Sequence, residues 1–124
     1  MSTRTPLARV EGLGAAHSGV GHFWRQRVTA AALVPLAVWF ICSAFALIGA
    51  ERSEAIAFLK EPFNAVMMAL FIIAASTHMS LGVQVVIEDY IHREGSKIAL
   101  LLLNQFFAWI VAAAALFALI KIVL

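Results

Sequence analysis

Charged residues are scarce in this sequence. Asp, Glu, Lys and Arg account for only 13% of the 124 residues, whereas 63% of the residues are hydrophobic. A soluble domain of this length has too little interior to hide so much apolar surface, which excludes an ordinary soluble fold. The formal net charge is only +2, so nothing suggests a nucleic-acid partner. The composition therefore indicates a membrane protein.

Cysteine is almost absent, and the sequence also lacks the features of transporters and of signal peptides. Cys42, the only cysteine, lies inside an apolar run, where a lone cysteine usually behaves as a small hydrophobe. The sequence has neither an internal repeat nor a pair of broken helices, which are the features typical of a transporter. No apolar core of a signal peptide follows Arg4 or Arg9, so we expect residues 1–27 to form a cytoplasm-facing tail.

Three long runs without Asp, Glu, Lys or Arg follow this tail. They span residues 28–50, 63–87 and 98–120. Each is longer than the roughly 20 residues that a helix needs to cross the hydrocarbon core of a bilayer. Backbone groups in lipid must be hydrogen-bonded internally, and runs of this length achieve that as helices. We therefore predict an all-α fold in which residues 28–124 form an anchor domain of three transmembrane helices.

Two local features refine this layout. Pro35 lies within the first run, where it is expected to kink or loosen the helix. The segment 51–62, between the first and second runs, is expected to hold a short interfacial helix.

The distribution of cations predicts the orientation. An odd number of spans places the two termini on opposite sides of the membrane. Six cations lie on the N-terminal side: Arg4, Arg9, Arg25, Arg27, Arg93 and Lys97. Three lie on the other side: Arg52, Lys60 and Lys121. Because cytoplasmic segments carry the excess of Lys and Arg, we expect a cytoplasmic N-terminus and a periplasmic C-terminus in a bacterial inner membrane, with the mitochondrial inner membrane as the alternative.

The second span is the most polar of the three. Its polar residues are Asn64, Ser76, Thr77, His78, Ser80 and Gln84. Such groups face protein or a cavity, because lipid cannot satisfy them. At about 100° per residue, His78 shares a helical stripe with Ala74 and Gly82, and Asp89 lies on it about 16 Å further along the axis. The small residues beside His78 leave room for a neighbouring helix or a flat cofactor.

A neutral imidazole at this depth has few uses. It can hydrogen-bond a neighbouring helix, relay protons or bind a metal. A single histidine suits haem, because the porphyrin supplies four nitrogens and the protein only axial ligands, whereas zinc needs several protein ligands. The residues alone leave an interhelical hydrogen bond and an axial haem ligand equally open for His78.

Two motifs resemble those of a known family. The second span reads His78-x-x-x-Gly82, then Gln84-Val85, and ends on Asp89-Tyr90, while Arg27-Val28-Thr29-Ala30 leads into the first span. These motifs, the three-span layout and the length resemble the smaller hydrophobic membrane anchor subunit of succinate dehydrogenase, the respiratory complex II. The resemblance covers residues 19–124 and is specific at the two motifs.

The resemblance implies a place in an electron-transfer complex. In that family a flavoprotein subunit oxidises succinate, electrons pass through an iron–sulfur subunit, and a quinone is reduced where that subunit meets two membrane anchors. This chain would tether the soluble subunits among the membrane lipids and would not be catalytic alone. It would share a haem b with the second anchor and form part of the site of a quinone, expected to be ubiquinone.

The resemblance also implies roles for four residues. His78 matches the axial ligand of the haem iron, and the second ligand would come from the other anchor. Tyr90 matches the quinone-binding tyrosine, whose hydroxyl donates a hydrogen bond to a quinone oxygen, and Asp89 matches the acid beside it. Arg27 matches an arginine placed to pair with a haem propionate.

Each role has a structural alternative. In a haem-free tether or a membrane scaffold, His78 would serve only helix packing. Tyr90 would be an interfacial aromatic anchor, as most tyrosines at membrane boundaries are. Asp89 would be a solvated acid that pairs with His92 or Arg93.

Overall fold

The fold is a row of long helices. The computed structural model describes residues 5–7 and 19–124, and no strand occurs among them. The helices are α2 (Gly19–Ala46), α3 (Arg52–Lys60), α4 (Pro62–Tyr90) and α5 (Glu94–Val123). Three of these, α2, α4 and α5, are long and apolar enough to cross a membrane. The predicted all-α fold with three membrane spans is therefore confirmed, and so is the predicted short helix between the first two.

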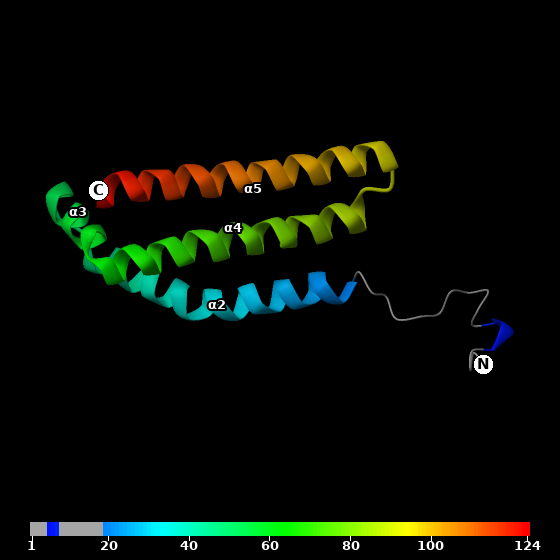
Figure 1. Cartoon of the computed structure of the whole chain (residues 1–124), viewed down its shortest axis with the longest axis horizontal. Helices are drawn as coiled ribbons and strands as arrows, with labels where there is room; N and C mark the ends of the chain where they lie inside the picture. Colours follow the sequence, from blue (N-terminus) through cyan, green and yellow to red (C-terminus); the bar gives the residue numbers. More distant parts are fainter. Residues whose placement is uncertain (1–4, 8–18) are drawn as a thin grey trace.

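The first helix differs from the predicted span at both ends. α2 begins at Gly19, upstream of residue 28, because no proline interrupts the polar approach segment and its residues continue the helix. It ends at Ala46, before residue 50. Gly49, three residues after the end of the helix, has a φ of 80°, a conformation that does not continue a helix. Pro35 lies inside α2 without ending it, and Figure 1 shows the helix axis bending between its two ends. The predicted tail lies largely outside the described residues.

The central position belongs to α4. Figure 1 shows α2 on one side of α4 and α5 on the other. Within the described chain α2 and α5 do not pack against each other. Phe40 of α2 stacks on Phe71 of α4 with ring centroids 4.6 Å apart. On the opposite side, the Asn104 side chain of α5 donates a hydrogen bond of 2.9 Å to the Ser80 carbonyl of α4.

The short helix α3 closes one end of the row. It packs against α4 and α5 at the end where the chain finishes (Figure 1). Its first turn is capped by Glu54, whose carboxylate accepts a hydrogen bond of 3.0 Å from the Glu51 N–H. The Asn64 side chain of α4 donates to the Phe58 carbonyl at 3.0 Å, which ties α3 to the start of α4. Pro62 at the first turn of α4 needs no intrahelical partner for its nitrogen.

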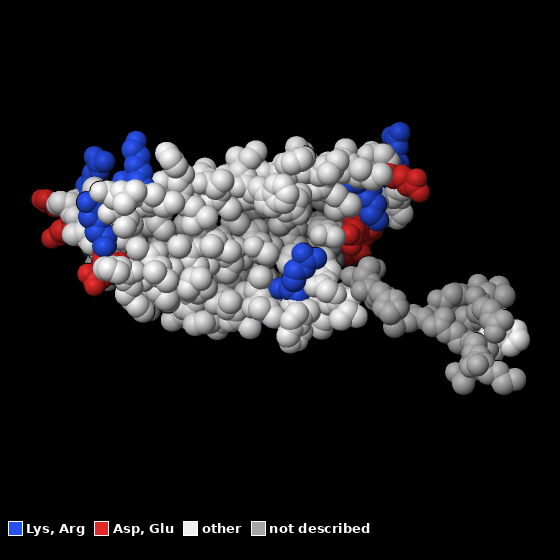
Figure 2. Space-filling model, viewed as in Figure 1, with Lys and Arg blue, Asp and Glu red and all other residues white. Residues whose placement is uncertain are grey.

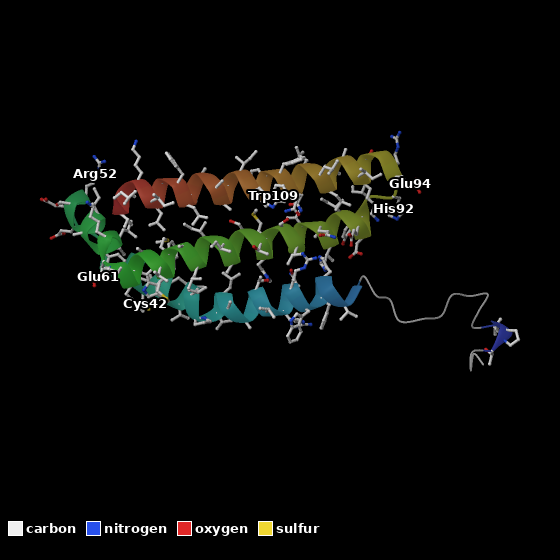
Figure 3. The ribbon with its side chains drawn as sticks, in the orientation of Figure 1. Cys42, Arg52, Glu61, His92, Glu94 and Trp109 are labelled. Atoms are coloured by element: carbon white, nitrogen blue, oxygen red, sulfur yellow. The ribbon has the colours of Figure 1, made fainter. Side chains whose placement is uncertain are left out.

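The surface matches a membrane-spanning bundle. Figure 2 shows acidic and basic side chains at the two ends and an almost uncharged belt between them, broken by a basic patch over the part of α2 that holds its arginines. Figure 3 places Arg52 and Glu61 at one end and His92 and Glu94 at the other. Large apolar side chains such as Phe45, Ile110 and Phe117 are exposed along the belt. An exposed apolar belt of this kind is what lipid covers, so the chain is a multi-pass membrane protein.

Candidate functional site

The predicted key histidine lies at the contact between α2 and α4. His78 is half-buried, and its Nδ1 atom lies 3.1 Å from the Thr29 hydroxyl oxygen of α2. This is the interhelical hydrogen bond that the sequence left open as one use of His78. The Nε2 atom of the same ring forms no hydrogen bond with any described residue. One side of the imidazole is therefore held by α2, and the other nitrogen is free.

Thr29 is itself held by the backbone of its own helix. Its hydroxyl oxygen lies 2.8 Å from the Arg25 carbonyl and 3.2 Å from the Gln26 carbonyl. These are the bonds to the preceding turn that a threonine makes inside a helix when no water is available. The contact to His78 therefore comes from a side chain whose position is fixed locally.

A cavity of about 670 Å³ opens beside His78, between α2 and α4. Its lining consists of His22, Phe23, Gln26, Arg27, Ala30, His78, Gln84, Val85 and Glu88. The lining holds both apolar and polar side chains, and the polar ones come from both helices. This cavity brings together two of the four predicted site residues, His78 and Arg27.

Two polar atoms in this cavity have no partner. His22 Nε2 and Gln26 Oε1 are buried and form no hydrogen bond. The side-chain amide of Gln26 also lies close to Gly82, where a Cβ atom would stand 3.8 Å from Gln26 Nε2. Gly82 thus faces α2, as its place on the His78 stripe suggested. Buried polar atoms without partners are costly and mark places where another group belongs.

Arg27 has a cationic side chain that no described acid neutralises. Its guanidinium carbon lies 5.0 Å from the centre of the Phe23 ring, a cation–π contact. The side chain is exposed and lines the same cavity as His78. Its position fits an anionic group that enters the cavity from the membrane surface.

Asp89 and Tyr90 lie apart from this cavity. Both are exposed at the end of α4, and 76% of the surface of Tyr90 is accessible to solvent. Asp89 forms neither a hydrogen bond nor an ion pair with another described residue, so the alternative pairing with His92 or Arg93 is absent there. His92 Nδ1 lies 3.1 Å from the Tyr90 carbonyl oxygen. The side chains of Asp89 and Tyr90 are thus exposed rather than enclosed.

Glu88 is a site residue that the sequence did not reveal. Its carboxylate accepts a hydrogen bond of 2.8 Å from Gln84, and both side chains line the cavity. Its backbone carbonyl accepts another from the Lys97 ammonium at 3.0 Å. Gln84 and Glu88 are four residues apart, and this spacing alone indicates that they lie on one face of the helix.

A second, smaller cavity is lined mainly by α4 and α5, with Arg25 of α2 at its edge. It has a volume of about 400 Å³ and includes Arg25, Thr77, Ser80, Gln105 and Trp109 in its lining. Thr77 donates its hydroxyl hydrogen to the Ile73 carbonyl at 2.8 Å. Thr77 therefore makes the same bond to its own helix as Thr29 does, but its hydroxyl forms no hydrogen bond with His78.

Comparison with known proteins places the chain in a family. Residues 1–112 match the family model described as "Succinate dehydrogenase/Fumarate reductase transmembrane subunit". The "Succinate dehydrogenase hydrophobic membrane anchor subunit" of Paracoccus denitrificans is 36% identical over 117 residues, which cover 94% of this chain and 90% of that protein. The protein of the same name from Rickettsia bellii is 35% identical over 88 residues, 71% of this chain and 70% of that protein.

A further relative widens the range of organisms. The "Succinate dehydrogenase membrane anchor subunit" of Reclinomonas americana is 31% identical over 94 residues, which cover 73% of this chain and 78% of that protein. No solved structure matches the chain. The family match and these relatives agree with the resemblance seen in the two motifs. The chain belongs to the family of succinate dehydrogenase/fumarate reductase transmembrane subunits.

Proposed function

We propose that this chain is the hydrophobic membrane anchor subunit of a succinate dehydrogenase. In this role it holds the flavoprotein and iron–sulfur subunits at the membrane together with a second anchor. The relatives that carry this name over most of their length support the proposal. The arrangement of the helices supports it as well, because α4 lies between α2 and α5 and packs against no other long helix in the described chain (Figure 1).

His78 is proposed as an axial ligand of haem b. The observation that carries this proposal is a half-buried imidazole with one nitrogen held by Thr29 and the other free beside a large cavity. No cluster of three or more His, Cys, Asp or Glu that could hold a metal ion occurs in residues 5–7 and 19–124. A lone histidine fits haem iron, because the porphyrin supplies the four equatorial nitrogens and the protein supplies only axial ligands. When bound, haem supplies a one-electron redox centre within the membrane.

The other cavity residues fit the rim of such a group. Arg27 offers a cation on the lining of the cavity for a propionate, with the charge-assisted bond that guanidinium groups form with carboxylates. His22 and Gln26, whose Nε2 and Oε1 atoms have no partner, line the same cavity. A group that fills the cavity would supply what these two atoms lack, either directly or through water.

Tyr90 and Asp89 are proposed to contribute to the site of a quinone, of the ubiquinone type. Their exposure at the end of α4 leaves them available to the iron–sulfur subunit and to the second anchor. The Tyr90 hydroxyl can donate a hydrogen bond to a quinone oxygen, a bond that strengthens as reduction makes the oxygen more basic. Asp89, which has no described partner, can hold a proton or a water near that oxygen.

The haem-free tether is the second candidate function. The Thr29–His78 contact favours it, because this bond already gives His78 a role in packing α2 against α4. The bond uses only one of the two ring nitrogens, so both functions can rest on the same contact. The two candidates differ in whether the free nitrogen binds iron.

The proposed orientation places the N-terminus in the cytoplasm and the C-terminus in the periplasm of a bacterial inner membrane. In the described chain, Arg25, Arg27, Arg93 and Lys97 lie toward one end of the row, and Arg52, Lys60 and Lys121 lie toward the other. Arg4 and Arg9, which lie outside the described residues, add to the first group. This excess supports a cytoplasmic location for the end that carries Tyr90.

The haem proposal is tested by replacing His78 with alanine in the assembled complex. We expect His78→Ala to abolish the b-type band in a reduced-minus-oxidised spectrum, because it removes the proposed iron ligand. The matched control is His92→Ala, since His92 is exposed and lies outside the cavity. An unchanged band and midpoint potential in His78→Ala would mean that His78 is not the ligand. A wild-type complex without a b-type band would favour the haem-free tether.

A further inference from the structure

We infer that Thr29 is a positioning residue for the metal ligand: it accepts a hydrogen bond from His78 Nδ1–H and thereby leaves Nε2 unprotonated and free to bind iron. This inference rests on the proposed haem function. Thr29 belongs to the motif Arg27-Val28-Thr29-Ala30 that leads into the first span. The position of its hydroxyl proton determines which nitrogen of His78 carries a hydrogen.

The Thr29 hydroxyl has a single proton and three polar neighbours. Two of these neighbours, the Arg25 carbonyl at 2.8 Å and the Gln26 carbonyl at 3.2 Å, can only accept a hydrogen bond. Two oxygens at 2.8 Å with no proton between them would repel each other. The Thr29 proton therefore points to its own backbone, toward Arg25.

The third neighbour is then the donor. With its proton committed to the backbone, the Thr29 oxygen has only lone pairs to offer to His78 Nδ1 at 3.1 Å. The Nδ1 atom must carry the hydrogen of that bond. A neutral imidazole has one N–H group, so Nε2 carries a lone pair, which is the form in which histidine binds a metal.

The same contact fixes the direction of the ring. Threonine is branched at Cβ, and its bond to the preceding turn restricts the side-chain rotamer further. Nδ1 is held toward α2, and Nε2, on the far side of the ring, forms no hydrogen bond with a described residue. Residues that hold the second nitrogen of a ligating histidine typically change metal affinity about 10- to 100-fold when they are removed.

The test compares Thr29→Val with Thr29→Ser in the assembled complex. Valine keeps the shape of threonine but cannot accept the bond, whereas serine keeps the hydroxyl. The matched control is Thr77→Val, which removes a hydroxyl that makes the same 2.8 Å bond to its own helix but forms no hydrogen bond with His78. The two readouts are the haem-to-flavin ratio of the purified complex and the midpoint potential of the haem band.

We expect Thr29→Val to lower the haem-to-flavin ratio or to raise the midpoint potential, and Thr29→Ser to restore both. Losing an acceptor at Nδ1 makes Nε2 a weaker donor, which disfavours ferric iron. If the bond is stronger in the ferric state by up to one ordinary hydrogen-bond contribution, its loss changes the ratio of oxidised to reduced haem by up to about tenfold. The tenfold limit equals about 59 mV for one electron.

The possible outcomes separate this inference from the function on which it rests. If Thr29→Val matches wild type and Thr77→Val in both readouts while His78→Ala loses the haem band, the positioning role is wrong and the haem proposal stands. Equal loss in Thr29→Val and Thr29→Ser would also overturn it, because the hydroxyl would then not be the relevant group. If His78→Ala keeps its haem, the proposed role of His78 as the iron ligand fails, and the positioning role of Thr29 fails with it.

Discussion

At the scale of single residues, α4 presents its chemistry in two different environments. His78 is half-buried and held by α2, whereas Tyr90 is largely exposed at the helix end. The first suits a group that must be kept from water, and the second suits a group that meets another subunit. About 18 Å of helix separates the two at 1.5 Å per residue.

The Tyr90 hydroxyl is predicted to matter for quinone reduction and not for assembly. Tyr90→Phe removes one donor from an exposed side chain, so the fold should be unaffected. We expect the succinate–quinone rate to fall about tenfold, the equivalent of one hydrogen bond of roughly 1.4 kcal/mol. The measurement is the rate with quinone relative to the rate with a soluble dye that accepts electrons from the soluble subunits.

The control for Tyr90→Phe is the dye-linked rate of the same preparation. It should equal that of wild type. A proportional loss of both rates would point to a defect in assembly, and an unchanged quinone rate would leave Tyr90 as an interfacial anchor only.

The residue-scale predictions from sequence succeeded where helical spacing carried the information. His78 and Gly82 lie on one face of α4 toward α2, as the periodicity indicated. The partners on α2 could not be predicted, because Thr29 and Gln26 meet α4 only through tertiary packing. The roles proposed for His78, Arg27, Asp89 and Tyr90 depend on groups that this chain does not contain, and they stay predictions.

At the scale of helices, α4 has two polar contacts on opposite sides. His78 meets Thr29 of α2, and Ser80, two residues later and about 200° around the helix, meets Asn104 of α5. Ser80 is the one buried polar residue in the described part of the chain, with 6% of its surface exposed. These bonds fix the register of α4 against both neighbours at nearly the same depth.

The Asn104–Ser80 contact is predicted to stabilise the pairing of α4 with α5. Asn104→Leu removes the 2.9 Å bond to the Ser80 carbonyl. Interhelical hydrogen bonds in membranes contribute about 0.6 kcal/mol on average and up to about 1.7 kcal/mol. We therefore expect the temperature at which membranes lose half of their succinate–quinone activity to fall by a few degrees.

Gln105→Leu is the matched control for this prediction. Gln105 is the next residue of α5, is exposed, and forms no hydrogen bond with the described part of the chain. Its replacement should leave the midpoint temperature within error of wild type. Identical midpoints for the two variants would mean that the Asn104 bond adds nothing to stability.

The long runs without charge predicted the three membrane helices but not all of their ends. The charge criterion placed the start of the first span after Arg27, whereas the helix itself continues back through Arg25 to Gly19. Charged residues end a stretch that lipid can cover, but they do not end hydrogen bonding along the backbone. The stop after Ala46 depends on the backbone of Gly49, which hydrophobicity does not report.

At the scale of the whole molecule, charged side chains gather at the two ends and leave an almost uncharged belt between them (Figure 2). The predicted excess of cations belongs to the end where α4 finishes and α5 begins. That end would face the cytoplasm, together with the soluble subunits that reduce the quinone. The order of the helices in the plane, with α4 between the others, was not predictable, because apolar faces in lipid do not specify their neighbours.

The orientation predicts the signals of two reporter fusions. A periplasm-active reporter fused after Leu124 should be active, since the third span carries this end across the membrane. The same reporter fused after His92, in the connection between α4 and α5, should be inactive. The reverse pattern would overturn the proposed orientation without affecting the fold.

The central place of α4 also sets an order in time. A chain is synthesised from its N-terminus, so α2 is complete before the helix that will become its neighbour. Because α2 does not pack against α5, only α4 can supply its intrachain packing among the long helices. Before α4 is synthesised, Thr29 can already form its hydrogen bonds to the carbonyls of its own helix. The side chain that later contacts His78 is thus oriented by α2 alone.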